Sequence, residues 1–143
     1  MKSKILLVLL IVFGFSLVGC FNTELEWFSP TDKKVTWDKA IELCSDKGGR
    51  LPTIDELKKV IVDCGGELRD EGYKGGSNLA DKNKADVVYQ QMYKGEGFGS
   101  SSYWSSSIMN NSKKAWVVNF SHGIVFSVFT GNHHYRYVRC VND

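Results

Sequence analysis

The stretch TWDKAIELCSDKGGRLPTIDEL, residues 36–57, decides the fold that we predict for this 143-residue chain. Its apolar residues recur at helical spacing from Trp37 to Cys44, which predicts an amphipathic helix with Cys44 on the buried face. Thr36 is suited to cap the start of this helix. The pair Gly48-Gly49 is expected to end it, because glycine adopts the left-handed backbone found after helices.

A second helix follows directly. Arg50-Leu51-Pro52 is predicted to be extended, because a residue before proline avoids the helical region. Thr53 to Glu56 reads T-x-x-E, which is the capping box of a helix start. This helix is expected to end near Cys64-Gly65-Gly66. Its predicted apolar face consists of Ile54, Leu57, Val60 and Ile61.

The last third of the chain has the pattern of strands. Apolar residues alternate in 115–120 and again in 124–128, and Ser121-His122-Gly123 between them predicts a tight hairpin. After a turn at 130–132, residues 135–141 are predicted to form the last strand. Helices followed by neighbouring strands predict an α+β fold, with two N-terminal helices packed on an antiparallel sheet.

The middle of the chain is less regular. Gly- and Ser-rich segments at 72–78 and 95–102 predict loops, with a short helix at 85–93 between them. Loops on a rigid scaffold carry function more often than the scaffold itself. We therefore expect ligand contacts from residues 95–104 together with 130–136.

The N-terminus has the features of an export signal. Lys2 and Lys4 precede the uncharged run 5–15, and Leu17-Val-Gly-Cys20 resembles the lipobox of bacterial lipoproteins. We predict a signal peptide at 1–19, a lipidated tether at 20–26 and one domain at 27–143. Cys20 would carry acyl chains such as palmitate and anchor the protein in a membrane. A short membrane anchor, or a secretory signal with Cys20 incidental, are the alternatives.

Charge and location follow from this division. Removal of residues 1–19 takes away two lysines and leaves 16 basic and 16 acidic residues. A neutral domain argues against nucleic acid as a partner, because phosphate neutralisation supplies most of that affinity. Phe21 rather than Asp after Cys20 favours the outer membrane or cell surface if the cell is Gram-negative.

Three cysteines remain beyond Cys20, and an exported compartment permits disulfides. A Cys44–Cys140 bridge would close a loop of about 100 residues, worth about 4–5 kcal/mol in the chain-entropy model. We favour that pair, which leaves Cys64 over as a buried small side chain. A metal or redox role for Cys64 is the alternative.

Four motifs resemble the DUF1566 family, described also as the C-terminal domain of Legionella collagen-like adhesins. They span about 27–141 and are 36–57, YWSSS at 103–107, AWVVNF-x-x-G at 115–123 and YRYVRCV at 135–141. The resemblance implies a C-type-lectin-like fold, related to the formylglycine-generating enzyme, in an exported binding or adhesion module. C-type lectins join their first helix to their last strand by a disulfide, which agrees with Cys44–Cys140. For the collagen-like adhesins the resemblance suggests sulfated glycans.

The sequence lacks the residue motifs that form the catalytic and metal sites of those relatives. The E-P-N, Q-P-D and W-N-D calcium motifs of C-type lectins are absent, and a lone Cys64 cannot supply the copper-binding pair of the formylglycine-generating enzyme. Histidine and cysteine together can bind zinc. However, the side chains of His133 and His134 are expected to point to opposite faces of a strand, so they would not share one metal ion. We predict no enzyme activity, no cofactor and no metal.

The remaining candidates form a binding surface of aromatic rings and donors. Sugar rings stack on aromatic faces, and arginine pairs with carboxylates or sulfates. The predicted ligand-binding residues are Tyr103, Trp104, His133, His134, Tyr135 and Arg136. The alternative is that Trp104, Trp116 and Tyr137 pack in the core, and that Arg50 and Arg139 have structural roles.

Together these observations predict a non-catalytic envelope lipoprotein with a lectin-like domain that recognises a glycan or a protein. A structural or assembly lipoprotein that docks on an envelope complex is the second hypothesis. A metal or redox enzyme centred on Cys64 and the histidines is the third.

Overall fold

A computed structural model of the chain describes residues 20, 25–70, 78–131 and 133–142. The predicted signal peptide at 1–19, residues 21–24 of the predicted tether and Asn132 lie outside the described residues. Within the described ranges, none of the helices combines the length and the apolar character needed to cross a membrane.

The longer described elements run from helices to strands, as predicted, and the short strands β1 and β2 lie before and between the helices. In chain order they are β1 (Lys34–Val35), α1 (Trp37–Asp46), α2 (Ile54–Asp63), β2 (Arg69–Asp70), α3 (Asn78–Ala85), α4 (Val87–Gly95), β3 (Ser102–Ile108), β4 (Lys114–Asn119), β5 (Ile124–Phe129) and β6 (Arg136–Tyr137).

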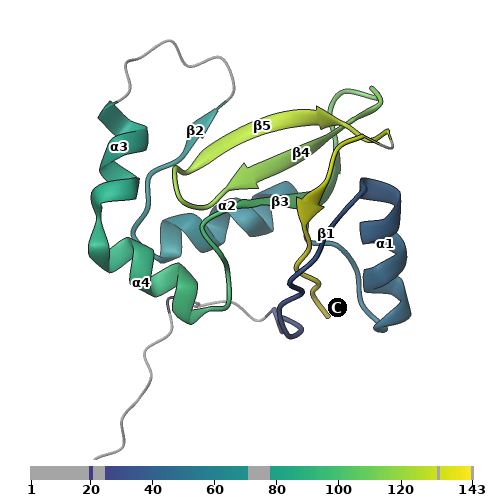
Figure 1. The fold of residues 1–143 in the computed structure, drawn as a ribbon, viewed down its shortest axis with the longest axis horizontal. Helices are drawn as coiled ribbons and strands as arrows, with labels where there is room; N and C mark the ends of the chain where they lie inside the picture. The colour runs from purple at the N-terminus through teal and green to yellow at the C-terminus, as the bar shows by residue number, and fades with distance from the viewer. Residues whose placement is uncertain (1–19, 21–24, 71–77, 132, 143) are drawn as a thin grey trace, which may run out of the picture.

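One sheet with the strand order β1-β6-β3-β4-β5-β2 organises the domain. The central pairs β3–β4 and β4–β5 are antiparallel, as is β1–β6, whereas β3–β6 and β2–β5 are parallel. Helix α1 lies at one end of the sheet and the α3–α4 pair at the other (Figure 1). The predicted α+β class with helices on a mostly antiparallel sheet is confirmed.

The predicted helix signals are present in the structure. Thr53 accepts a hydrogen bond from the N–H of Glu56, and the Glu56 carboxylate accepts one from the N–H of Thr53, which completes the capping box. Thr36 occupies the N-cap of α1 without a side-chain hydrogen bond. After α1, Gly48 has a φ of +80°, and the N–H of Gly49 reaches the carbonyl of Cys44. This is the hydrogen-bond pattern of a glycine-terminated helix.

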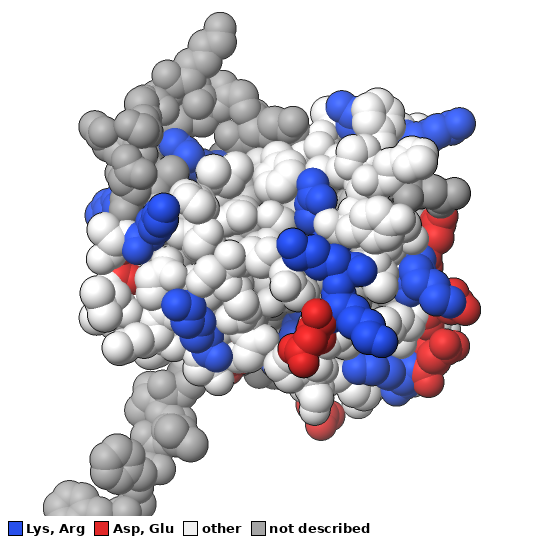
Figure 2. Space-filling view, viewed as in Figure 1, with Lys and Arg blue, Asp and Glu red and all other residues white. Residues whose placement is uncertain are grey.

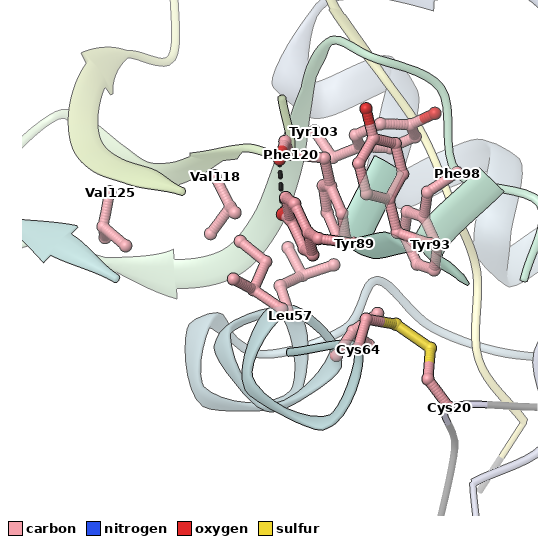
Figure 3. Close-up of a cluster of buried hydrophobic side chains, with 12 residues drawn as sticks. Cys20, Leu57, Cys64, Tyr89, Tyr93, Phe98, Tyr103, Val118, Phe120 and Val125 are labelled. Carbon is pink, nitrogen blue, oxygen red and sulfur yellow. Dashed lines mark hydrogen bonds between the residues drawn. A yellow bond between two sulfur atoms is a disulfide. The ribbon is translucent and has the colours of Figure 1, made fainter. Parts of the chain in front are cut away.

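The sheet is buried on both faces. Along β4, Ala115 and Val117 pack in one apolar cluster and Val118 packs in the other, so that the two clusters lie on opposite faces. Helix α1 supplies the first cluster with Ala40 and Cys44. The second cluster combines α2 with aromatic side chains and includes Leu57, Val60, Ile61, Tyr89, Tyr93, Phe98, Tyr103 and Phe120 (Figure 3).

Two elements differ from the sequence prediction. The middle segment holds two helices, α3 and α4, in place of one short helix at 85–93. The predicted strand at 135–141 pairs continuously only at Arg136–Tyr137, after which Val141 forms isolated bridges with Trp27 and Arg50. Because Val141 pairs with two different segments, residues 138–141 do not form a continuous strand with a single partner.

The disulfide between Cys44 and Cys140 confirms the predicted pair. Their Cα atoms lie 5.3 Å apart, and the bond joins α1 to the segment after β6 across 96 positions of sequence. Both side chains are almost completely buried in the same cluster. The first helix and the end of the chain are therefore covalently joined.

Cys64 is not the unpaired residue that the sequence analysis predicts. It is buried, as predicted, but it forms a disulfide with Cys20, so that every cysteine of the described residues is paired (Figure 3). Cys20 is only 8% exposed and packs beside α2, which differs from the predicted tether at this residue. One sulfur cannot form both a disulfide and a thioether to lipid, so this bond and acylation of Cys20 exclude each other.

Candidate functional site

A pocket of about 360 Å³ lies where the start of the domain meets the loop between α4 and β3. Three segments build it: residues 30–32 before β1, residues 97–101 after α4, and the paired strands β3 and β6. Its described lining is Pro30, Thr31, Asp32, Gly97, Gly99, Ser100, Ser101, Tyr103 and Tyr137. A concave site of this size, formed mainly by loops on a sheet, is suited to a small ligand.

Two tyrosines form the wall of the pocket on the sheet. Tyr103 and Tyr137 are register partners in the parallel pair β3–β6, which places their side chains on the same face. Their ring centroids are 5.7 Å apart with an interplanar angle of 33°. Tyr103 is 5% exposed, whereas Tyr137 is half-buried and presents more of its ring.

The hydroxyl of Tyr103 is held in place by the loop. Its oxygen accepts a hydrogen bond of 2.6 Å from the N–H of Gly99. Burial raises the pKa of Tyr103 above its usual value, although the Gly99 N–H and nearby Arg139 oppose that rise. The phenol therefore stays protonated at neutral pH, and the described part of the chain supplies no acceptor for its proton. That proton is available to a ligand in the pocket.

The loop beside the pocket depends on Gly97. Gly97 has a φ of +81°, and its N–H donates to the carbonyl of Lys94, while the N–H of Phe98 donates to the carbonyl of Tyr93. These two bonds end α4 and turn the chain toward the pocket. A Cβ at Gly97 would approach Arg139 Nη1 to 2.8 Å, so that both backbone and space favour glycine here.

Arg139 supports the loop from behind, as the sequence analysis proposed. Its guanidinium donates to the carbonyls of Glu96 and Gly97 and lies 5.2 Å from the centroid of Phe98. Burial lowers the pKa of Arg139, and its Nε–H has no acceptor among the described residues. Arg139 does not line the pocket, so it positions the loop rather than contacting a ligand directly.

Hydrogen-bonding groups other than Tyr103 surround the pocket. Thr31 donates a hydrogen bond of 2.7 Å to the carbonyl of Val138. The hydroxyl of Ser100 is paired with Tyr93. The exposed Asp32 is the charged member of the described lining. Lys34 lies just outside, with its ammonium 5.1 Å from the ring centroid of Tyr137.

The predicted ligand-binding residues divide between the pocket and other places. Tyr103 lines the pocket. Trp104 is fully buried in the cluster on the opposite face of the sheet, and its Nε1–H donates to the carbonyl of Val35. Trp104 therefore has the core position that the alternative interpretation of the sequence gave it, because neighbouring residues of a strand point to opposite faces. Arg136 lies over the Trp104 ring at 6.0 Å and covers it.

The turn before β6 does not contribute to the described lining of the pocket. His133 and Tyr135 are exposed and His134 is half-buried, and the N–H groups of both histidines reach the carbonyl of Gly131. Of the two loops that were expected to cooperate, the one near 97–103 lines the pocket, and the described residues of 130–136 do not. Thr31 and Asp32 were not predicted as site residues, and Tyr137 was expected in the core under the alternative interpretation.

Other polar motifs have structural roles. Ser105 donates to the carbonyl of Trp116, and Ser107 accepts from the N–H of Ile54 at the start of α2. Arg50 forms a two-point salt bridge with Glu56, at 2.8 and 2.9 Å. Ser105 thus joins β3 to β4, and Ser107 joins β3 to the start of α2.

Charges on the domain are mixed. In Figure 2, lysine and arginine side chains are spread over the visible face, with acidic side chains between them at the edge near α1. Within the described ranges, no three side chains of histidine, cysteine, aspartate or glutamate come together as a set that could hold a metal ion.

The chain belongs to the Lcl C-terminal domain family, which it matches over residues 21–142. This finding confirms the resemblance that the four sequence motifs indicated. Among curated proteins, no significant match to the chain is found.

Among solved structures, the chain is similar to TC14, a C-type lectin from the tunicate Polyandrocarpa misakiensis. The sequence identity is 12% and the TM-score is 0.44, and the alignment covers 84% of this chain and 98% of the lectin.

Proposed function

We propose that this protein is a non-catalytic binding module of the bacterial envelope that recognises a glycan or protein ligand through the pocket. The observation that supports the proposal is the pocket itself, which combines loop hydroxyls, Tyr103 and Tyr137 around a volume of about 360 Å³. Membership of the Lcl C-terminal domain family agrees with a binding role.

The test is saturable binding that depends on the pocket. The purified full chain is applied to a glycan array and sedimented with isolated peptidoglycan, and each assay is repeated with Tyr137→Ala. Saturable binding that Tyr137→Ala weakens supports the proposal. Binding that the variant leaves unchanged contradicts the pocket as the site, and the lack of any saturable ligand contradicts the binding function.

We further propose that Cys20 is the lipid acceptor and that the domain is held at a membrane, at the outer membrane or cell surface if the cell is Gram-negative. The lipobox at 17–20 supports this proposal. In the acylated protein Cys64 has a free thiol, and the Cys20–Cys64 disulfide is the state of chains that escape acylation. Detection of the acyl chains on Cys20 by mass spectrometry tests this step.

An assembly role is the second candidate, and one observation favours it. Val87 and Val88 in the first turn of α4 are 65% and 67% exposed, which is unusual for adjacent valines. A photo-crosslinker at position 88 in cells would then capture one fixed envelope protein, and a crosslinker at exposed Lys39 on α1 would not.

A further inference from the structure

Resting on the proposed binding function, we propose that the pocket takes a neutral sugar ring, with Tyr137 beneath the ring and the hydroxyls of the sugar bonded to Tyr103, Ser101 and Asp32. The ligand is then an uncharged sugar and not a sulfated or otherwise polyanionic glycan.

The charge of the described lining disfavours a polyanion. Asp32 is its charged member, and its carboxylate accepts hydrogen bonds and repels sulfate or carboxylate groups. Arg139, which could attract an anion, is 6% exposed, lies outside the lining and directs its two Nη groups to the loop carbonyls. Lys34 stands at the margin. A ligand inside the pocket therefore meets acceptors and hydroxyls rather than cations.

The polar groups match a sugar because they supply donors and acceptors side by side. The Tyr103 proton is a donor with its own oxygen already occupied by the N–H of Gly99. Within the described residues, the side chains of Ser101 and Asp32 have no hydrogen-bond partner that would compete with a ligand, so a ligand hydroxyl can donate to either of them. A sugar hydroxyl both donates and accepts, and so can satisfy Tyr103 and Asp32 together.

The aromatic wall supplies the apolar contact. The ring of Tyr137 is half-buried, and Lys34, an exposed and long side chain, lies over it. A neutral sugar ring would take the place of the Lys34 ammonium on that face, because the carbon–hydrogen face of a sugar packs on an aromatic ring. Lys34 therefore competes with a neutral ligand, whereas it would attract an anionic one.

The experiment measures affinity by calorimetry on the full chain with named probes. The neutral probes are mannotriose, lactose, maltotriose and the trimer of N-acetylglucosamine, together with any neutral glycan that the array retains. The polyanionic probe is a heparin-derived hexasaccharide. We expect saturable binding of at least one neutral probe, with little change between low and high salt because no ion pair is formed.

Four variants identify the contacts. Tyr137→Ala is expected to weaken binding about tenfold or more, whereas Tyr137→Phe retains the ring and most of the affinity. Asp32→Asn is expected to weaken binding about threefold to tenfold through a lost charge-assisted hydrogen bond. Lys34→Ala is expected to raise the affinity for a neutral probe, because it removes the competing ammonium from the Tyr137 ring. Tyr135→Ala is the matched control, since Tyr135 is an exposed tyrosine outside the described lining.

The outcomes separate this inference from the proposed function. Salt-sensitive binding of the heparin probe that Lys34→Ala weakens, or pocket-dependent binding of a protein, overturns the neutral sugar but retains a pocket that binds. The absence of saturable binding by every neutral glycan also overturns the inference. If Tyr135→Ala weakens the binding and Tyr137→Ala does not, the site itself is wrong.

Discussion

The carboxylate of Glu96 accepts a hydrogen bond of 2.7 Å from the main-chain N–H of Cys20, a residue 76 positions earlier. The main-chain carbonyl of the same Glu96 accepts a hydrogen bond of 2.8 Å from Arg139. The next residue, Gly97, lines the pocket. The end of α4 therefore contacts Cys20 on one side and supports the pocket on the other.

The chemistry of Cys20 gives the first prediction. In the bacterial host, the full chain is expected to carry acyl chains on Cys20 and one thiol that alkylating reagents modify, at Cys64. The same domain exported behind a signal peptide without a lipobox is expected to contain the Cys20–Cys64 disulfide and no reactive thiol. Intact-mass measurement after alkylation checks both products. A host-derived chain with two disulfides and no lipid would contradict the anchor.

The second prediction concerns the bond between Cys44 and Cys140. Its loop spans 96 positions, so that the chain-entropy model gives about 4–5 kcal/mol of stabilisation. We expect the double variant Cys44→Ser, Cys140→Ser to lose an amount of that order in the free energy of unfolding, measured by urea denaturation. A loss below about 1 kcal/mol would show that native contacts such as the Arg50–Val141 bridge suffice without the disulfide.

Local sequence patterns are sufficient to predict several of these structural features. The helix starts at Thr36 and Thr53, the Cys44–Cys140 pair and the hairpin at 121–123 depend on short-range chemistry or on one strong entropic term. They were all predictable from the sequence.

The pocket was predictable only in part. Tyr103 lies in the loop-to-strand region that was expected to bind, but Tyr137 and residues 30–32 reach the pocket through the parallel β3–β6 pairing. That pairing joins residues that are 34 positions apart, and alternation along one strand does not reveal which strand lies beside it. The face of Trp104 was ambiguous for the same reason, because both faces of the sheet are covered.

Glu56 provides a prediction on pH. Hydrogen bonding from Arg50 lowers the pKa of Glu56 below its usual 4.5, with further help from Thr53 and against the effect of burial. The unfolded chain therefore binds this proton more readily than the folded one, so that the stabilisation is present above pH 4.5 and is lost as the pH falls through the lowered value.

Glu56→Gln isolates that charge, because glutamine can still complete the capping box. We expect it to cost about 1 kcal/mol at pH 7 and progressively less below pH 4.5, as followed by thermal unfolding across pH. Asp55→Asn is the control, since that side chain is 88% exposed in the same helical turn. An equal pH response from both variants would argue against the Arg50–Glu56 pair as the cause.

The pocket loop supplies the last prediction. Gly97→Ala places a Cβ at a residue with a φ of +81° and 2.8 Å from Arg139 Nη1, so we expect a loss of about 1–3 kcal/mol in the free energy of unfolding. Gly95→Ala, two residues earlier in α4, meets no atom within 4 Å and should stabilise the protein by about 0.5–1 kcal/mol. Urea denaturation of both variants, with the affinity for any ligand found, tests the loop and the pocket together.

The entry and exit of the domain lie side by side. The N–H of Phe28 donates to the carbonyl of Cys140 and the N–H of Asn142 to the carbonyl of Glu26, and Figure 1 shows the early purple segment beside the C-terminus. A polypeptide that enters and leaves at one point can be spliced into a longer chain, or repeated along one, without stretching its neighbours. A domain of this form is therefore compatible with insertion into different proteins, because the host chain need supply only two adjacent attachment points.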